Sequence, residues 1–173
     1  MADKSKQEKT LYMTRLMTPD MANFSGKVHG GTILKLLDEA AYSCAARYCK
    51  TYAVTKSLDQ VVFRESITVG DLVTFKCNVN YVGRTSMEVG IRVEAQNLTS
   101  KTKYHAISCY FTMVSVNEQG SPQEVPKLEL ESDQEIKLFQ AGKMRCDMRR
   151  EIQERNQALH VGIDTEVITR KSL

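Results

Sequence analysis

The sequence ANFSGKVHGGTILKLLDEAA, residues 22–41, decides how the rest of the chain can fold. Gly30 and Gly31 stand where a loop gives way to a helix, and glycines there let a ligand or another backbone approach the helix N-terminus. The unpaired N–H groups and the positive dipole end of a helix favour an oxygen that carries negative charge. Asp38 follows about two turns later in the same helix. Donors for an oxyanion beside a carboxylate predict a site for acyl transfer or hydrolysis.

The helix that starts at these glycines is expected to cover residues 30–49, with one broad apolar face. Asp38 falls at the edge of that face, whereas Lys35 and Glu39 fall on the opposite, solvated side. The residues that share the apolar arc are Ile33, Leu34, Leu37, Ala40, Ala41, Cys44 and Ala45. A helix with so broad an apolar face has to be buried against other elements of the fold.

Strand patterns flank this helix in the sequence. One predicted strand precedes it, at residues 11–17, and four follow it, at residues 53–63, 72–82, 86–97 and 104–116. The alternation of apolar and polar residues in the middle strands is typical of strands with one buried face. Because the links between the strands are short, neighbouring strands form hairpins and an antiparallel sheet. We therefore expect an α+β fold in which this sheet wraps around the long central helix.

One domain with an appended helix accounts for the 173 residues. Ser132 and Glu135 form a capping box that begins the last helix, and the charge of this helix, together with Gly142, predicts exposure or packing across a subunit interface. A single sheet of this kind leaves an edge and a face uncovered, and both favour dimerisation. The expected divisions are a flexible N-terminus at residues 1–9, the main domain at 10–126, the C-terminal helix within 127–156 and a loosely ordered tail at 157–173.

The composition restricts the classes of function. A chain with 42% hydrophobic and 26% charged residues can build a real core, and a net charge of +3 is mild. Trp is absent and no basic stripe with interleaved aromatics occurs, so we expect no nucleic-acid partner. The start, MADKSKQEKT, lacks the apolar core of a signal peptide, and the longest apolar segment, residues 33–46, is too short to span a bilayer. We therefore expect a cytoplasmic protein that does not insert into membranes.

The cysteines and histidines show no metal-binding or disulfide pattern. The five cysteines are irregularly spaced without a C-x-x-C pair, which favours reduced thiols in a cytosolic protein over a disulfide framework or a zinc ribbon. The three histidines lie far apart without H-E-x-x-H spacing. We therefore expect no metal site and no cofactor.

Three segments of the chain together resemble the hotdog-fold acyl-CoA thioesterases. They are ANFSGKVHGGTILKLLDEAA (residues 22–41), VVFRESITVGDLV (61–73) and VGRTSMEVGIRVEAQN (82–97). The most similar branch is the cytosolic one, which includes the brain-type acyl-CoA hydrolase and short bacterial relatives. Vertebrate members carry two such units in one chain, whereas this chain has one. The resemblance therefore implies a hotdog fold and a homodimer in which the partner supplies the second unit.

The resemblance also implies the reaction and its catalytic groups. Acyl-CoA is hydrolysed to free fatty acid and coenzyme A at two sites on the dimer interface, and the dimers often assemble further into a hexamer, a trimer of dimers. The catalytic pair falls on Asn23 from the loop and Asp38 from the partner subunit, with the backbone N–H groups of Gly30 and Gly31 as oxyanion donors. The family member with the most similar helix has Glu where Asp38 stands, so the reach of this acid is shorter.

Further positions match the segments that bind coenzyme A. The turn formed by Gly83, Arg84, Thr85 and Ser86 matches the segment that holds the coenzyme A arm, since it offers a guanidinium and two hydroxyls. His29, beside the glycines, is expected to line the pocket or to pack. The basic run at residues 143–150 is a solvated helix face, or it meets the nucleotide phosphates of a neighbouring subunit.

Several roles stay open on sequence alone. Asp38 can act as a general base on water or as a nucleophile that forms a mixed anhydride. It can also be an interface carboxylate paired with Arg47 or Arg64. Asn23 can contact water or the substrate carbonyl, or it can shape the loop through an Asx-turn.

Two other classes of function compete with hydrolysis. One is a non-catalytic hotdog protein that binds or senses acyl-CoA. The other is a hotdog hydratase or dehydratase that acts on enoyl or hydroxyacyl thioesters. Because that chemistry generally uses a His with an acid, Asn23 with Asp38 fits it poorly.

Overall fold

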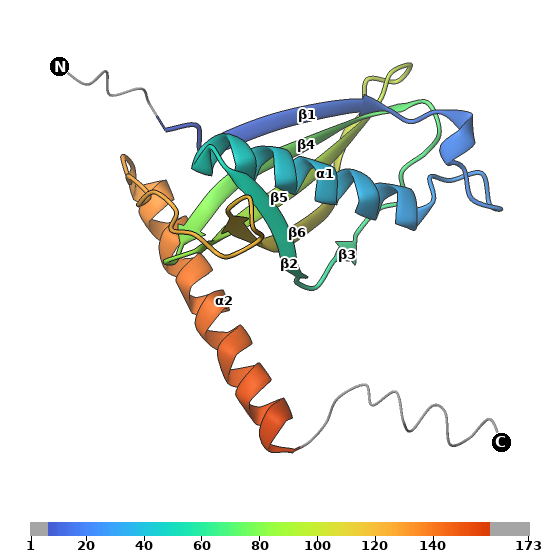
Figure 1. Cartoon of the computed structure of the whole chain (residues 1–173). Helices are drawn as coiled ribbons and strands as arrows, with labels where there is room; N and C mark the ends of the chain where they lie inside the picture. Colours follow the sequence, from blue (N-terminus) through green and yellow to red (C-terminus); the bar gives the residue numbers. More distant parts are fainter. Residues whose placement is uncertain (1–6, 160–173) are drawn as a thin grey trace, which may run out of the picture.

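A long helix lies across the concave face of a curved antiparallel sheet, and a second long helix leaves the other side of that sheet (Figure 1). The computed structural model describes residues 7–159. In chain order the elements are β1 (Thr10–Leu16), a 3-10 turn (Pro19–Met21), α1 (Gly30–Cys49), β2 (Tyr52–Leu58), β3 (Val62–Phe63), β4 (Asp71–Val82), β5 (Ser86–Asn97), β6 (Lys103–Val116) and α2 (Asp133–Ala158). The strand order across the sheet is β1-β4-β5-β6-β2, with β3 paired to β6.

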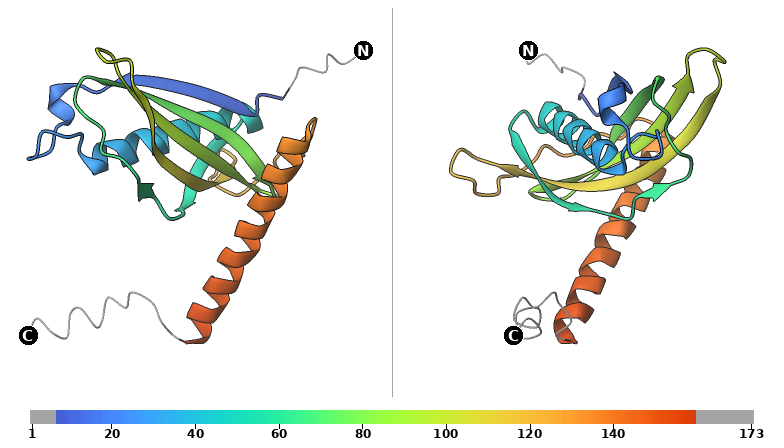
Figure 2. Two further views of the ribbon diagram at one scale, coloured as in Figure 1. Left: turned by 180° about the vertical axis from the view of Figure 1, so that it is seen from behind. Right: turned by 90° about the vertical axis from the view of Figure 1, so that its right-hand side faces the viewer.

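The helix α1 occupies the place and the limits that its sequence predicts. Its left-handed C-cap at Lys50 turns the chain back into β2. The sheet cups α1 on one side (Figure 2), and the core forms where the inner faces of β4, β5 and β6 meet the buried arc of the helix. The largest fully buried side chains include Phe75, Phe111, Met113 and Leu37. This hotdog arrangement confirms the expected fold class.

One position of the predicted apolar arc is wrong. Leu34 is 37% exposed, whereas Leu36, which was not assigned to the arc, is buried. Leu34 lies on the same flank of α1 as Asp38, one turn before it, and Asp38 accepts a hydrogen bond from Thr55 of β2. Because β2 is the last strand on that side of the sheet, this flank of α1 lies at an open edge.

The predicted strand at residues 53–63 is also wrong, because it is interrupted. β2 ends at Leu58 and β3 begins at Val62, so the link between them leaves the ladder. The backbone N–H of Asp59 still donates to the carbonyl of Tyr110 on β6, at 2.9 Å. A β-bulge lies further back in the same strand, between Thr55 and Ser57.

Residues 7–9 differ from the flexible N-terminus that the sequence predicts. Lys9 is buried, and its ammonium group lies 2.8 Å from a carboxylate oxygen of Glu135 and 2.8 Å from the carbonyl of Glu129. The N-terminal segment is therefore attached to the start of α2. The remaining parts of the predicted flexible ends, residues 1–6 and 160–173, lie outside the described residues.

The helix α2 begins at its capping box and packs on its own sheet rather than lying fully exposed. Ser132 Oγ accepts from the N–H of Glu135, as the spacing predicts. Gly142 is buried against β4, and a Cβ added there would lie 2.6 Å from Cβ of Tyr81. Phe139 adds an aromatic contact with Tyr81, with ring centroids 5.0 Å apart. Only the last part of α2, residues 150–158, is exposed along its whole length.

Candidate active site

A cleft opens at the N-terminus of α1. It has a volume of about 390 Å³ and lies between the loop that carries Asn23 and the segment that follows β3. Gly30 and Ile33 form part of its wall from α1, and Phe63 and Arg64 face them from the other side. This volume is within the range of small-molecule sites. Two of the motif segments, residues 22–41 and 61–73, therefore line one cavity.

His29 is the N-cap of α1. Its Nδ1 accepts a hydrogen bond from the N–H of Gly31 at 2.9 Å, so one of the two predicted oxyanion donors is occupied by this ring. Among the described residues, the N–H of Gly30 makes no hydrogen bond. Gly30 lies against the ring of Phe63, because a Cβ added at Gly30 would be 3.6 Å from Cζ of Phe63. An N–H without a hydrogen bond, at the wall of a cleft, is a suitable donor for a carbonyl oxygen that gains charge.

Asn23 shapes the loop before α1. Its Oδ1 accepts hydrogen bonds from the N–H and the hydroxyl of Ser25 at 2.9 and 2.7 Å, and from the N–H of Lys27 at 3.1 Å. The Asx-turn interpretation of Asn23 is therefore realised in the structure. Its amide nitrogen makes no hydrogen bond within residues 7–159. Because the oxygen is already used, this nitrogen is the group that Asn23 can still offer to a ligand, and Asn23 lines the cleft.

Asp38 lies apart from the cleft, on the exposed flank of α1. Its Oδ1 accepts a hydrogen bond of 2.6 Å from the hydroxyl of Thr55 on β2. Neither of the arginines considered as partners from the sequence is paired with it, because Arg47 binds Glu8 and Arg64 lines the cleft. Within one chain, the structure does not bring Asp38 and Asn23 into one cavity.

Thr55 is the residue of this region that sequence reasoning missed. It lies 17 positions after Asp38 and is brought to it only because β2 folds back along α1. No spacing rule connects a helix carboxylate to a hydroxyl on the next strand. Thr55 is followed by Lys56 and Ser57, so a polar residue at this point of the strand does not stand out.

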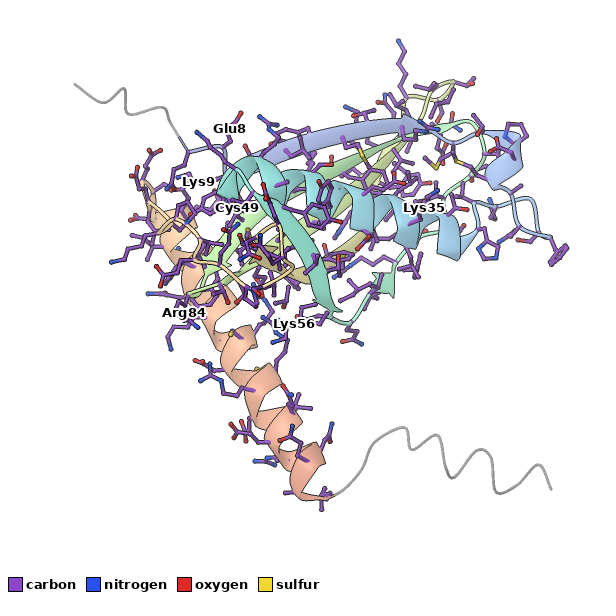
Figure 3. All side chains as sticks on the ribbon, in the orientation of Figure 1. Glu8, Lys9, Lys35, Cys49, Lys56 and Arg84 are labelled. Atoms are coloured by element: carbon purple, nitrogen blue, oxygen red, sulfur yellow. The ribbon has the colours of Figure 1, made fainter. Side chains whose placement is uncertain are left out.

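The predicted turn that holds coenzyme A lies at the far end of the sheet from the cleft. Figure 3 shows Arg84 at one end of the molecule and Lys35, in the first turns of α1, near the other. Arg84 is exposed, and the N–H of Gly83 closes the turn on the carbonyl of Ser86 at 2.8 Å. The carbonyl of Thr85 accepts from the backbone of β6, which anchors the turn.

The register of the sheet places this turn near the same end of the strands as Thr55, which binds Asp38. Thr55 pairs with Met113 on β6, and Met113 pairs with Met87 on β5, directly after Ser86. One chain therefore carries two separate groups of predicted site residues. In the first group, Asn23 and Gly30 line the cleft, whereas His29 and Gly31 adjoin Gly30 in the chain but do not line it, contrary to the expectation that His29 lines the pocket. The second group consists of Asp38, Gly83, Arg84, Thr85 and Ser86, together with Thr55.

The β2 edge of the sheet, which carries Thr55, is apolar and exposed. Tyr52 is 60% exposed, and Val54, Leu58 and Val62 are exposed as well. Unpaired edge strands with apolar side chains favour pairing with another chain. This edge can therefore accept a strand of another chain.

The cysteines near α1 are unsuited to nucleophilic catalysis. All five cysteines are free, and Cys44, Cys49, Cys77 and Cys109 are buried. Burial raises the pKa of the Cys44 thiol to about 12 and that of Cys109 to about 12. Because the thiolate is the reactive form, these two groups are inert at neutral pH and serve the core.

Two further observations concern metals and membranes. Among residues 7–159, no three His, Cys, Asp or Glu side chains lie close enough together to bind a metal ion. In the same part of the chain, neither helix has the length and apolar composition that crossing a bilayer requires.

Proteins similar in sequence include acyl-CoA thioester hydrolases. A family model described as the thioesterase superfamily matches residues 25–101. The protein VdlD of Helicobacter pylori is 45% identical over 148 residues, which cover 86% of this chain and 82% of that protein. The cytosolic acyl coenzyme A thioester hydrolase of Mus musculus is 38% identical over 135 residues, which cover 77% of this chain but 35% of the longer mouse protein.

Solved structures give the same result. A hexameric acyl-CoA thioesterase without ligand superposes with a TM-score of 0.79 at 35% identity, covering 82% of this chain and 91% of that one. An acyl-CoA hydrolase from Staphylococcus aureus, in complex with butyryl coenzyme A, coenzyme A and coenzyme A disulfide, has a TM-score of 0.79 at 28% identity and covers 89% of this chain and 95% of its own. Structures of that enzyme also exist for alanine variants of an asparagine, an aspartate and a threonine.

The similarity extends over most of this chain and most of its short relatives, and the hotdog architecture agrees with it. The chain therefore belongs to the thioesterase superfamily, among the hotdog-fold acyl-CoA thioester hydrolases.

Proposed function

We propose that the protein hydrolyses acyl-CoA to a fatty acid and coenzyme A at sites shared between two subunits. One observation carries the proposal: Asn23 and Gly30 line a cleft that Asp38 does not reach, while Asp38 lies with Thr55 at an exposed sheet edge. Pairing of two β2 edges about a twofold axis would bring the Asp38 of each subunit toward the cleft of the other. Each dimer then has two equivalent sites, as an isologous interface requires.

The cleft binds the thioester carbonyl. The N–H of Gly30 and the amide nitrogen of Asn23 donate to the carbonyl oxygen, which becomes negatively charged when the carbonyl carbon is attacked. The N–H of Gly31 joins them once the ring of His29 turns away from it. Each preorganised donor of this kind contributes about 3–4 kcal/mol to stabilisation of the transition state.

Asp38 supplies the attack from the partner subunit. As a general base it takes a proton from water, the water oxygen bonds to the carbonyl carbon, the C–S bond breaks, and the proton held by Asp38 passes to the sulfur so that coenzyme A leaves as a thiol. As a nucleophile its carboxylate oxygen bonds to the carbonyl carbon as the C–S bond breaks and the coenzyme A thiolate leaves to be protonated from solvent; water then hydrolyses the resulting anhydride to the fatty acid and free Asp38. In both routes the Thr55 hydroxyl donates to one carboxylate oxygen and leaves the other for the reaction.

The relatives support this assignment of residues. In the Staphylococcus aureus enzyme, the asparagine, aspartate and threonine that were replaced follow one another at the spacing of Asn23, Asp38 and Thr55 here. That enzyme was crystallised with butyryl coenzyme A, which supports acyl-CoA as the substrate class. The turn at residues 83–86 then contacts the coenzyme A arm from the subunit that also supplies Asp38.

The assembly and the location belong to the same proposal. Hexameric thioesterases among the similar structures support a trimer of dimers as the working form. The mouse relative is a cytosolic enzyme, which supports a cytoplasmic location here. The reaction as written needs no metal or further cofactor, since the acid and the backbone donors supply its chemistry.

Mixing two inactive variants tests the shared site. Asn23→Ala and Asp38→Asn should each lower kcat for butyryl-CoA by about 100-fold or more. When the two proteins are mixed, unfolded and refolded together, hybrid dimers contain one site with both residues intact. Since half of the random dimers are hybrids with one good site each, about a quarter of the wild-type activity should return.

The other outcomes are equally clear. If the mixture stays inactive although hybrids form, both residues act within one chain and the shared-site mechanism is wrong. If the wild-type protein binds acyl-CoA tightly without releasing thiol, it is an acyl-CoA sensor. If it adds water to an enoyl-CoA instead, it is a hydratase.

A further inference from the structure

Arg145 and Arg149 of α2 face a buried carboxylate. Glu88 on β5 is 1% exposed, and its two oxygens accept from Arg145, with the Nη2–Oε1 distance at 2.7 Å. Arg149 Nη1 lies 3.4 Å from the other oxygen. The predicted solvated face for the basic run at residues 143–150 is therefore wrong at these two positions. Both guanidinium groups turn toward the sheet because an uncompensated carboxylate lies there.

The second carboxylate of the group lies in another segment. Arg149 Nη1 also donates to Oδ2 of Asp59, the first residue after β2. The guanidinium of Arg145 stacks on Tyr110, 3.7 Å from the ring centroid. We name Glu88, Asp59, Arg145 and Arg149 the Glu88 cluster. Its two positive and two negative charges cancel, and it joins α2 to three parts of the sheet.

Glu88 is buried, while Asp59 and the two arginines are half-buried, and a charge cluster of this kind is poorly explained by stability alone. Moving charges out of water costs several kcal/mol per ion, so that a buried ion pair is often no more stabilising than an apolar replacement. What such a group adds is a fixed geometry, because each charge has to stay opposite its partner. The relevant question is therefore which segment the Glu88 cluster fixes.

That segment is the link between β2 and β3. Thr55, which binds Asp38, lies four positions before Asp59, and Phe63, which covers Gly30, lies four positions after it. The link has left the ladder, so the Tyr110 carbonyl and Arg149 are the contacts that hold Asp59. Figure 3 shows Lys56 of β2 on the side toward α2, and Lys56 lines a shared hollow with Arg149.

We propose that Asp59, Arg149 and Glu88 are positioning residues for the thioesterase reaction. Through Arg149, α2 fixes Asp59 and with it the two strands on either side. Thr55 is thereby held against Asp38 for one active site, and Phe63 is held against the Gly30 donor for the other. The inference rests on the proposed function, and it makes α2 a part of the active-site framework rather than an appendage.

Neutral variants of the contact test this role. Asp59→Asn and Arg149→Gln should each lower kcat for butyryl-CoA by about 10-fold, with KM changed by less than about 3-fold, because misplacement of reacting groups affects the chemical step more than binding. Asp59→Glu keeps the charge and should recover part of the kcat. The matched control is Lys143→Gln, which breaks the exposed Lys143–Asp147 pair on the same helix and should leave kcat unchanged.

Hydrogen exchange on the ligand-free protein provides a readout that does not depend on activity. The amides of residues 59–66 should exchange faster in Asp59→Asn and Arg149→Gln than in the wild type, while those of β5 stay protected. Variants that keep wild-type kcat and merely melt at lower temperature would overturn the proposal, as would a lower kcat with unchanged exchange at 59–66. If the wild type releases no thiol, the proposed function fails, and the exchange result still decides whether the Glu88 cluster fixes the link.

Discussion

At the scale of single residues, existing hydrogen bonds determine what each side chain can still do. The oxygen of Asn23 is used by the loop, which leaves its amide nitrogen as a donor. One oxygen of Asp38 accepts from Thr55, which orients the carboxylate and leaves the other oxygen available. The ring of His29 covers the N–H of Gly31. A substrate carbonyl therefore has to displace His29 before both glycine amides can bind it.

The Thr55 hydroxyl offers a direct prediction. Thr55→Val keeps the shape of the side chain but removes the donor to Asp38, so kcat should fall by about 10-fold as the carboxylate loses its orientation. Thr55→Ser restores the hydroxyl and should return most of the activity. Steady-state kinetics with butyryl-CoA measures both. Equal activity of the Val and Ser variants would show that the hydroxyl is not needed.

Sequence reasoning reached some of these residues and not others. Asn23, Gly30, Gly31 and Asp38 fall within one continuous segment, where helix periodicity and glycine placement indicate a site. Thr55 is a contact made by the tertiary fold, and no local pattern encodes it. The hydrogen bond between His29 and Gly31 was equally out of reach, because it depends on the rotamer of an exposed ring.

At the scale of elements, α2 is attached to the rest of the protein at two places, its first turn and its middle. The Glu88 cluster fixes it at Arg145 and Arg149, and Glu135 in its first turn binds Lys9. Between these points Gly142 lets the helix backbone approach β4 closely. The side-chain hydrogen bond from Lys9, together with the backbone N–H of Glu131, lowers the pKa of Glu135 below its ordinary value of 4.5.

The lowered pKa makes this attachment sensitive to acid. A carboxylate whose pKa falls on folding adds stability above its unfolded pKa, and the contribution is lost as the pH drops through the folded pKa. Glu135→Gln should therefore reduce the free energy of unfolding by about 1 kcal/mol at neutral pH. The difference from wild type should be smaller at about pH 3 than at pH 7, because falling pH protonates Glu135 and removes its charge.

Urea unfolding at the two pH values measures this difference. Glu154→Gln, an exposed position on the same helix, serves as the control and should match the wild type at both. A loss of stability in Glu135→Gln that is the same at both pH values would show that its charge does not matter.

The elements themselves were largely predictable. The limits of α1 follow from its glycines and apolar arc, and those of β4 and β5 follow from alternation. The break between β2 and β3 was not predicted, because Val61, Val62 and Phe63 continue the strand-like composition after Asp59 and Gln60, and Asp59 is held by Arg149, 90 positions away. The basic run of α2 was misjudged for the same reason, since its partners come from distant strands.

At the scale of the whole molecule, the sheet has two unlike edges. The β2 edge carries exposed apolar side chains and the Thr55–Asp38 contact, whereas the opposite edge is β1. A homodimer was expected from sequence because a single sheet leaves an edge and a face open. Which edge it uses depends on where the site residues emerge, and a single chain's sequence does not reveal that.

Charge on the two edges distinguishes them. Val54→Glu places like charges close to the proposed twofold axis, so the dimer should dissociate at micromolar concentrations and activity should fall in parallel. Tyr12→Glu alters an exposed side chain on β1 and should leave the β2-mediated dimer intact. Light scattering during gel filtration measures the mass of each. Dissociation of the Tyr12 variant alone would place the dimer interface on the β1 edge and contradict the proposal.

The bulge between Thr55 and Ser57 makes the hydrogen-bonding register of the β2 edge irregular. A regular edge accepts any extended peptide at any offset, which is how open-ended fibrils grow. One additional residue in the ladder interrupts that repeat and twists the strand locally. A second β2 strand with the same bulge, in antiparallel orientation, can pair with it in only one register. The irregularity thus favours closed dimers over fibrils, and in the proposed dimer it would set the register of the two β2 strands.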